Sequence, residues 1–219
     1  MNKMRIKERK YRKLSQLILI VLLPTVIIGG YFYPYLGFIV VALIVFFLIL
    51  AAFRGRFYCG WFCPMGSFHE RVLASFTFKR EIPQLFRKSW FRWLVFVVMM
   101  ALLTSRLIQA GTNPEKIADA FRFMWIVSTS IAIGIGVIFK PRIWCRVCPM
   151  ASMQGLISKN TYLLKVGNDC KECKLCQKVC PISSAPFASK KKGYLNSEEC
   201  MRCFNCVENC PQKAVTFSK

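Results

Sequence analysis

Four long apolar segments alternate with polar stretches over most of the chain. They lie at residues 14–33, 36–53, 90–107 and 123–139, and each is close to the ~20 residues that a helix needs to cross a hydrocarbon core. The remaining C-terminal stretch has no such segment and is rich in cysteine and lysine. The pattern predicts an α-helical membrane domain with four transmembrane helices, residues 1–162, followed by a small domain outside the bilayer, residues 163–219.

Composition and charge exclude two other classes of protein. The 219 residues include 55% hydrophobic side chains, with 32 lysines and arginines against 10 acidic residues and a formal net charge of +22. Intrinsic disorder is excluded, because disordered chains contain too few apolar side chains to form a core. The basic residues alternate with long uncharged segments, which is typical of a membrane protein and not of a soluble nucleic-acid-binding protein.

The distribution of the basic residues predicts an orientation. Twenty-nine of the 32 lysines and arginines lie before the first apolar segment, between the second and third, or after the fourth. An excess of lysine and arginine marks the cytoplasmic side of a membrane. We therefore expect a multi-pass protein of a bacterial or archaeal cytoplasmic membrane, with both termini and the cysteines on the cytoplasmic face.

Eight of the 12 cysteines form two C-x2-C-x2-C-x3-C-P runs, each ending in a Cys-Pro pair. This spacing is typical of bacterial two-cluster ferredoxins, in which three thiolates bind one [4Fe–4S] cluster and the fourth binds the other cluster. The alternative is a pair of zinc sites, whose ligands more often come as two separated pairs. The prediction is a small α+β ferredoxin domain with cluster A on Cys170, Cys173, Cys176 and Cys210, and cluster B on Cys200, Cys203, Cys206 and Cys180.

The other four cysteines lie in an internal repeat. Residues 56–68 align with residues 142–153 after one deletion, and each copy follows an even-numbered apolar segment. The repeat predicts that the membrane domain consists of two similar hairpins whose C-x3-C-P and C-x2-C-P segments meet at the cytoplasmic face. We expect a third iron–sulfur cluster there, with structural zinc or a redox-active dithiol as alternatives. Its ligands would be Cys59, Cys63, Cys145 and Cys148.

The single histidine, His69, follows the first of these segments. One histidine cannot supply both axial ligands of a b-type haem, so a lipid-soluble quinone or a partner subunit would have to extend any electron path across the membrane. An imidazole titrates in the range needed to accept a proton from a quinol. We therefore consider His69 as a catalytic proton acceptor at a quinone site, against the alternative that it is an incidental interfacial residue.

The two cysteine segments, above all Tyr58–Pro64 (YCGWFCP), together with the ferredoxin runs resemble the NapH- and NosR-like membrane polyferredoxins. The resemblance implies an electron-transfer subunit, of quinol-dehydrogenase type, and not a stand-alone enzyme. It would pass electrons between the quinone pool or a cytoplasmic donor and a partner redox protein. The alternative is an assembly or regulatory ferredoxin that supplies reducing equivalents for the maturation of a respiratory metalloenzyme.

The expected partners follow from this resemblance and from the charge. They are membrane lipid and quinone, a partner redox protein or reductase subunit, and an acidic soluble electron donor attracted by the basic surface. No nucleic-acid partner is expected.

Overall fold

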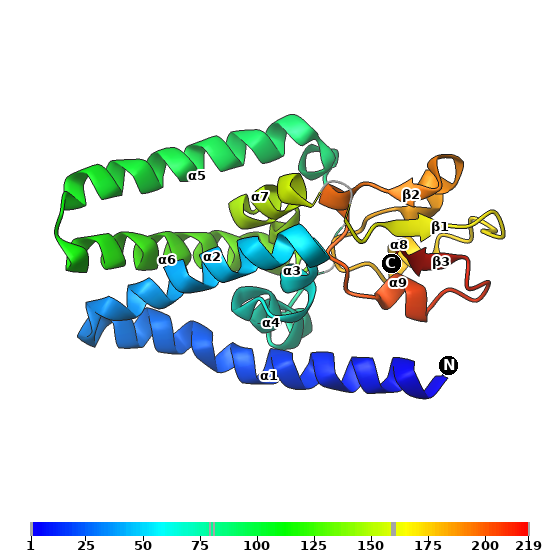
Figure 1. Cartoon of the computed structure of the whole chain (residues 1–219), viewed down its shortest axis with the longest axis horizontal. Coiled ribbons are helices and arrows are strands. Elements are labelled where there is room, and N and C mark those ends of the chain that lie inside the picture. Colours follow the sequence, from blue (N-terminus) through cyan, green and yellow to red (C-terminus); the bar gives the residue numbers. More distant parts are fainter. Residues whose placement is uncertain (1, 79, 81, 159–160, 219) are drawn as a thin grey trace.

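The computed structural model describes residues 2–78, 80, 82–158 and 161–218, and it has two parts along its long axis (Figure 1). Four long helices form one end, and a small three-stranded sheet with two short helices forms the other, with the N-terminal part of the first long helix beside it. The helices that carry the repeated cysteine segments lie between the two ends. Three of the basic residues used to predict the orientation, Lys79, Lys159 and Lys219, lie outside the described residues.

The long helices are α1 (Asn2–Phe32), α2 (Gly37–Arg54), α5 (Ser89–Ala110) and α6 (Pro114–Ile138). All four are long and apolar enough to cross a membrane, which confirms the four segments predicted from the hydrophobic pattern. In α1 only the part from Lys10 to Phe32 qualifies as a span. Helix α6 lies at the centre of the group and packs against α1, α2 and α5.

The third and fourth helices are longer than the sequence pattern predicts. The pattern predicts a connection over residues 108–122, but α5 continues to Ala110 and α6 begins at Pro114. The side chain of Asn113 accepts hydrogen bonds from two backbone N–H groups of the first turn of α6, at 3.0 and 3.4 Å. This cap and the proline at the first helical position explain the early start.

Parts of both cysteine segments pack against a face of small residues on α6. Ser128, Ala132 and Gly136 recur every four residues and are buried. The indole nitrogen of Trp144 donates a hydrogen bond to the hydroxyl oxygen of Ser128 at 3.0 Å. Helix α4 also packs against α6, and a Cβ atom at Gly136 would lie 3.5 Å from the ring of His69. The small face therefore provides space for side chains from the segments that hold the cysteines.

Both repeated cysteine segments fold into a short helical turn followed by a second helix. The first segment forms α3 (Phe57–Trp61) and α4 (Pro64–Arg71), and the second forms a 3₁₀ turn (Ile143–Arg146) and α7 (Pro149–Ile157). Cys63 and Cys148 are the N-cap residues of α4 and α7, and the prolines after them occupy the first helical position. The Cys-Pro pairs thus start the second helix in each copy, because proline is well suited to that position.

The C-terminal part is an antiparallel sheet with helical turns. The strands β1 (Leu164–Val166), β2 (Tyr194–Leu195) and β3 (Val215–Phe217) are ordered β2-β1-β3, with Leu164 opposite both Leu195 and Phe217. The short helices α8 (Leu175–Lys178) and α9 (Asn205–Glu208) contain the third cysteine of each run. The other elements are 3₁₀ turns at Pro34–Leu36, Leu73–Ser75, Gln84–Arg87, Pro186–Lys192 and Ser197–Glu199.

The apolar core of this C-terminal domain is small. Leu164, Leu195, Cys206 and Val215 are its buried members, and three further cysteines pack against them. Domains of this size seldom bury enough apolar surface to be stable without additional cross-links or bound metal.

Candidate iron-sulfur sites

The C-terminal domain contains two small cavities, each lined by four cysteines. One is lined by Cys170, Cys173, Cys176 and Cys210, and the other by Cys180, Cys200, Cys203 and Cys206. These are the two sets into which the sequence spacing divides the cysteines, including the exchange of the fourth cysteine between the runs. We call them set A and set B. In the described part of the chain, no three His, Cys, Asp or Glu side chains converge as they would around a single metal ion.

The backbone around the two sets repeats with a period of 30 residues, as the cysteines do. Six of the seven described non-glycine residues with positive φ form three equivalent pairs in the two runs. Such conformations are uncommon outside glycine, so their recurrence marks two loops with the same curvature. The pairs are Glu172 and Arg202, Lys174 and Phe204, and Ser183 and Lys213.

Backbone N–H groups point at several of the sulfur atoms. The amide of Ser184 donates to Sγ of Cys180 at 3.3 Å, and the amide of Arg202 donates to Sγ of Cys200 at 3.4 Å. Hydrogen bonds of this kind favour the charged form of the acceptor, so they favour a thiolate ligand.

The remaining four cysteines line one apolar cavity of about 320 Å³, which is also bounded by three of the long helices. We call Cys59, Cys63, Cys145 and Cys148 the membrane set. The cavity is otherwise lined mainly by methionine, aromatic and aliphatic side chains of α2, α5, α6 and α7. Its few polar groups include the side chains of Tyr58, Trp125 and Ser128. The two cysteine segments, 82 residues or more apart in the chain, therefore meet at a single site.

Two buried arginines connect the segments reciprocally. Nη1 of Arg142 donates to the carbonyl oxygen of Cys59 at 2.6 Å, and Nη2 of Arg56 donates to the carbonyl oxygen of Cys145 at 2.6 Å. Each arginine lies three residues before the first cysteine of its own segment and binds the first cysteine of the other. Both arginines are 1% exposed. The thiol of Cys59 also donates to the amide oxygen of Gln154 in α7 at 3.1 Å.

A carboxylate on α4 balances part of this buried positive charge. Nη2 of Arg142 lies 2.6 Å from Oε2 of Glu70, and Nη2 of Arg12 lies 2.9 Å from the same oxygen. Burial alone would raise the pKa of Glu70, but the guanidinium groups of Arg142, Arg12 and Arg71 lower it below its ordinary value. In the described part of the chain, no carboxylate lies within ion-pair distance of Arg56. The site thus retains excess positive charge.

Burial strongly disfavours free thiolates in the membrane set. It raises the pKa of Cys63, Cys145 and Cys148 to about 12, and the neighbouring thiols contribute to the increase. A catalytic dithiol needs the opposite shift, because the thiolate is the reactive form. These cysteines would lose their protons on binding a cation, and the resulting anionic site would lie beside buried guanidinium groups. The residues therefore fit a thiolate-bound iron–sulfur cluster better than a redox-active dithiol.

His69 lies elsewhere. Its ring is 2% exposed, its Nδ1 atom is 2.6 Å from the carbonyl oxygen of Met65, and it faces Gly136 of α6. Burial lowers its pKa. His69 is not among the residues that line the apolar cavity, so its role as a proton acceptor for a quinone stays a prediction.

The C-terminal domain is held closely against the membrane set. Arg56 donates a hydrogen bond to the carbonyl oxygen of Glu198, and the indole nitrogen of Trp61 donates to the carbonyl oxygen of Arg202 at 3.3 Å. Ile182 and Met201, both fully buried, belong to the same apolar cluster as Cys59, with Cys180 of set B packed against it. Set B is thus the nearer of the two C-terminal sets to the membrane set.

Sequence analysis did not identify Arg56, Arg142, Glu70 or the cavity as parts of the site. A signal for the two arginines was present, because both occupy the first position of the repeated segment. Basic residues next to an apolar segment are, however, also expected on the cytoplasmic side of any membrane helix.

Comparison with known proteins defines the class of the chain. A family model described as a 4Fe-4S binding domain matches residues 36–83 and 121–166, which include the membrane set. A second, described as a 4Fe-4S dicluster domain, matches residues 162–211. The chain is therefore an iron–sulfur protein of the 4Fe–4S ferredoxin type, with a ferredoxin-like C-terminal domain after four apolar helices.

Its relatives include a regulatory protein and a ferredoxin-type protein. The chain is 28% identical to an uncharacterized protein of Methanocaldococcus jannaschii, over 100% of this chain and 89% of the relative. It is 27% identical to the regulatory protein NosR of Pseudomonas aeruginosa (70% of this chain, 23% of NosR) and 26% identical to the ferredoxin-type protein NapH of Haemophilus influenzae (78% and 65%). No solved structure matches it significantly. The chain is an iron–sulfur electron-transfer protein related to NapH and NosR, as the cysteine motifs predicted.

Proposed function

We propose that this protein is a membrane-bound electron-transfer subunit with three iron–sulfur clusters, held by set A, set B and the membrane set. The observation that carries the proposal is that 12 cysteines form three groups of four, and each group lines its own cavity. Bound clusters would supply one-electron chemistry, while the chain supplies ligands, spacing, local charge and access. Residues 1–162 would form the membrane domain and residues 163–219 the two-cluster ferredoxin domain.

The third cluster is supported by the charge of its surroundings. A cluster held by four thiolates has a net negative charge, and the membrane set lies beside two buried guanidinium groups with one nearby carboxylate. The guanidinium groups favour thiolate ligands and stabilise additional negative charge, so they would raise the reduction potential of the site. The reciprocal bonds of Arg56 and Arg142 are the contact expected between two similar hairpins related by approximate two-fold symmetry.

A quinone is the lipophilic substrate that we propose for the apolar cavity. The cavity extends beyond the four cysteines to side chains of α2, α5 and α6, which leaves room beside a cluster, and its lining is apolar apart from a few hydrogen-bonding side chains, as in many small-molecule sites. The hydroxyl of Tyr58 and the indole N–H of Trp125 could orient quinone oxygens. Since the same cavity is lined by all four cysteines of the membrane set, a bound quinone would be next to the proposed cluster.

The proposed orientation places both termini and all three sets on the cytoplasmic face. It rests on the basic residues that flank the long helices. The cytoplasmic membrane of a bacterium or archaeon is the compartment that suits a protein of this kind. The alternative function, an assembly or regulatory factor that reduces a maturing metalloenzyme, is favoured by the similarity to NosR, which is named as a regulatory protein.

Metal content and quinol-dependent reduction test the proposal. Protein purified anaerobically should contain about 12 irons and 12 acid-labile sulfides per chain, since each of three cubes contributes four of each. The Cys59→Ser variant should lose about a third of the iron, while a Cys173→Ser variant should change the signals of set A only. Eight irons in the wild type, unchanged by Cys59→Ser, would exclude the third cluster. Failure of a menaquinol or ubiquinol analogue to reduce any cluster, while dithionite reduces all of them, would favour the alternative function.

A further inference from the structure

The charges of the C-terminal domain are separated between its two faces. Glu198 forms an ion pair with Arg92 near the membrane part, and Glu199 lies 3.7 Å from Arg146. Glu208 lines a polar cavity together with Arg12 of α1. Three of the five acidic residues of this domain thus face basic residues of the membrane domain.

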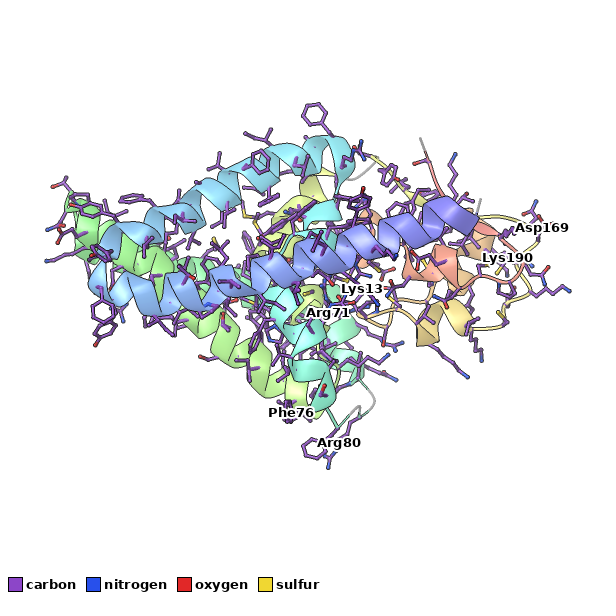
Figure 2. All side chains as sticks on the ribbon, turned by 90° about the horizontal axis from the view of Figure 1, so that it is seen from below. Lys13, Arg71, Phe76, Arg80, Asp169 and Lys190 are labelled. Atoms are coloured by element: carbon purple, nitrogen blue, oxygen red, sulfur yellow. The ribbon has the colours of Figure 1, made fainter. Side chains whose placement is uncertain are left out.

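The opposite face carries lysines. Seven described lysines of the domain are exposed: Lys165 lies in β1, and we call the other six the lysine surface, namely Lys171, Lys174, Lys178, Lys191, Lys192 and Lys213. Two exposed acidic residues, Asp169 and Glu172, lie among them, and Lys190 is 3.8 Å from Glu172. Figure 2 shows Asp169 and Lys190 at one end of the molecule, near the N-terminal end of α1 and far from the other end of that helix.

Part of the lysine surface lies next to set A. Lys171 and Lys174 line the same cavity as the four cysteines of this set, and Nζ of Lys190 donates to the carbonyl oxygen of Cys170 at 2.7 Å. Cys173 is the one exposed cysteine of the 12 in the chain, all of which the structure describes. Set A is therefore the site at which an electron could enter or leave from solution over the shortest distance.

We propose that the lysine surface is the docking site of a soluble acidic one-electron carrier protein. Its charge is complementary to such a carrier, and complementary charge speeds the encounter of redox proteins. Asp169 and Lys190, which border this surface, lie at the end of the molecule away from the connection between α5 and α6 and beyond the candidate span of α1, so the surface faces solvent and not the membrane that holds the spans. In each encounter the carrier loses or gains one electron and the chain gains or loses the same electron at set A, with no bond formed or broken and no proton transferred.

This inference rests on the proposed function, and one set of samples tests both. The probe is an acidic [2Fe–2S] ferredoxin, and its association with the detergent-solubilised holoprotein is measured by surface plasmon resonance at several salt concentrations. The test variant is the triple change Lys171→Glu, Lys174→Glu and Lys213→Glu. The control is Lys13→Glu, Lys88→Glu and Lys116→Glu, which changes the net charge equally at exposed lysines of the membrane domain.

The association rate of wild-type protein should fall as salt increases. The test variant should associate at least about tenfold more slowly at low salt, because electrostatic steering is worth roughly 10- to 1,000-fold in rate, and the control should remain within about twofold of wild type. An equal decrease in the association rate of both variants, or an association rate of wild-type protein that does not depend on salt, would overturn the docking site. Binding of anionic vesicles or RNA through these lysines without binding of the ferredoxin would also overturn it.

Iron and sulfide content, measured on the same samples, separates the two proposals. If the test variant has full cluster content and binds the ferredoxin as the wild type does, the docking site is refuted but the proposed electron-transfer function is not. Lysine-dependent binding by protein without iron in set A would refute the electron-transfer role of that site and leave the binding surface in place.

Discussion

Arg142 donates a hydrogen bond to the carbonyl oxygen of Cys59, and Arg56 returns the equivalent bond to Cys145, both at 2.6 Å. Each cysteine segment is therefore fixed by an arginine of the other. The backbone groups involved are buried, and an unpaired buried carbonyl is costly. Loss of either arginine would therefore leave a buried carbonyl group of the other segment unpaired.

Replacing Arg142 should destabilise both the fold and the membrane set. The Arg142→Leu change leaves the Cys59 carbonyl unpaired and removes one cation from Glu70, and breaking such a buried pair costs about 3 kcal/mol. We expect a lower melting temperature in detergent and loss of iron from the membrane set, with the signals of sets A and B retained. Arg80→Leu, at an exposed arginine, is the control and should melt like the wild type. Normal melting and iron content in Arg142→Leu would show that the reciprocal bonds are dispensable.

Glu70 should make stability depend on pH in the acidic range. Its pKa in the folded protein lies below the ordinary value of 4.5, so its contribution is complete above about pH 4.5 and declines as pH falls through the folded-state pKa. The difference in melting temperature between wild type and Glu70→Gln should therefore be constant from about pH 7 to 5 and shrink at lower pH. Taking the difference between the two melting temperatures at each pH removes the effect of acid on the clusters themselves, which is common to both proteins. A difference that grows on acidification would contradict the assigned charge state.

The Gly60→Ala change should loosen the contact between the two domains. A Cβ atom at Gly60 would lie 2.5 Å from the carbonyl oxygen of Met201, so the C-terminal domain would have to shift. Overpacking of this kind costs about 1–3 kcal/mol. We expect faster release of the C-terminal domain by trypsin and slower electron exchange between set B and the membrane set. Gly134→Ala is a matched control, because no heavy atom lies within 4 Å of the Cβ position there.

Filling the apolar cavity should block reduction by quinol and leave chemical reduction intact. Leu103 lines the cavity, whereas its neighbour Leu102 is absent from the lining and 42% exposed. A steric penalty of about 1.4–3 kcal/mol corresponds to a loss of affinity of roughly ten- to 150-fold. Leu103→Trp should therefore greatly reduce quinol-dependent reduction, while Leu102→Trp should not. Equal activity of the two variants would place the quinone outside this cavity.

The elements with strong periodic or spacing signals could be predicted from the sequence. The four spans follow from apolar length, and the division of eight cysteines into two sets follows from the Cys-Pro runs. The helix ends at Ala110 and Pro114 were missed because the apolar pattern stops before the capped turn at Asn113 begins.

The buried polar contacts of the site were not predictable in this way. Arg56, Arg142 and Glu70 are common types of residue for a cytoplasmic flank, and their burial depends on neighbours from the other half of the chain. The same is true of the cavity, which is formed by helices from both halves of the membrane domain. His69 illustrates the limit, since its position next to Glu70 does not reveal that its ring lies against Gly136 of α6 and is not part of the cavity lining.

The backbone of Met201 packs closely against Gly60, and hydrogen bonds from Trp61 and Arg56 add to this contact, so the C-terminal domain is held in one position against the rest of the protein. A carrier domain on a flexible tether collects an electron at one place and swings to deliver it at another, and its motion sets the rate. Here the internal route has no swinging step. In the proposed electron path, control over the flow would therefore reside at its two ends, which are the proposed docking site on the lysine surface and the proposed quinone site in the cavity.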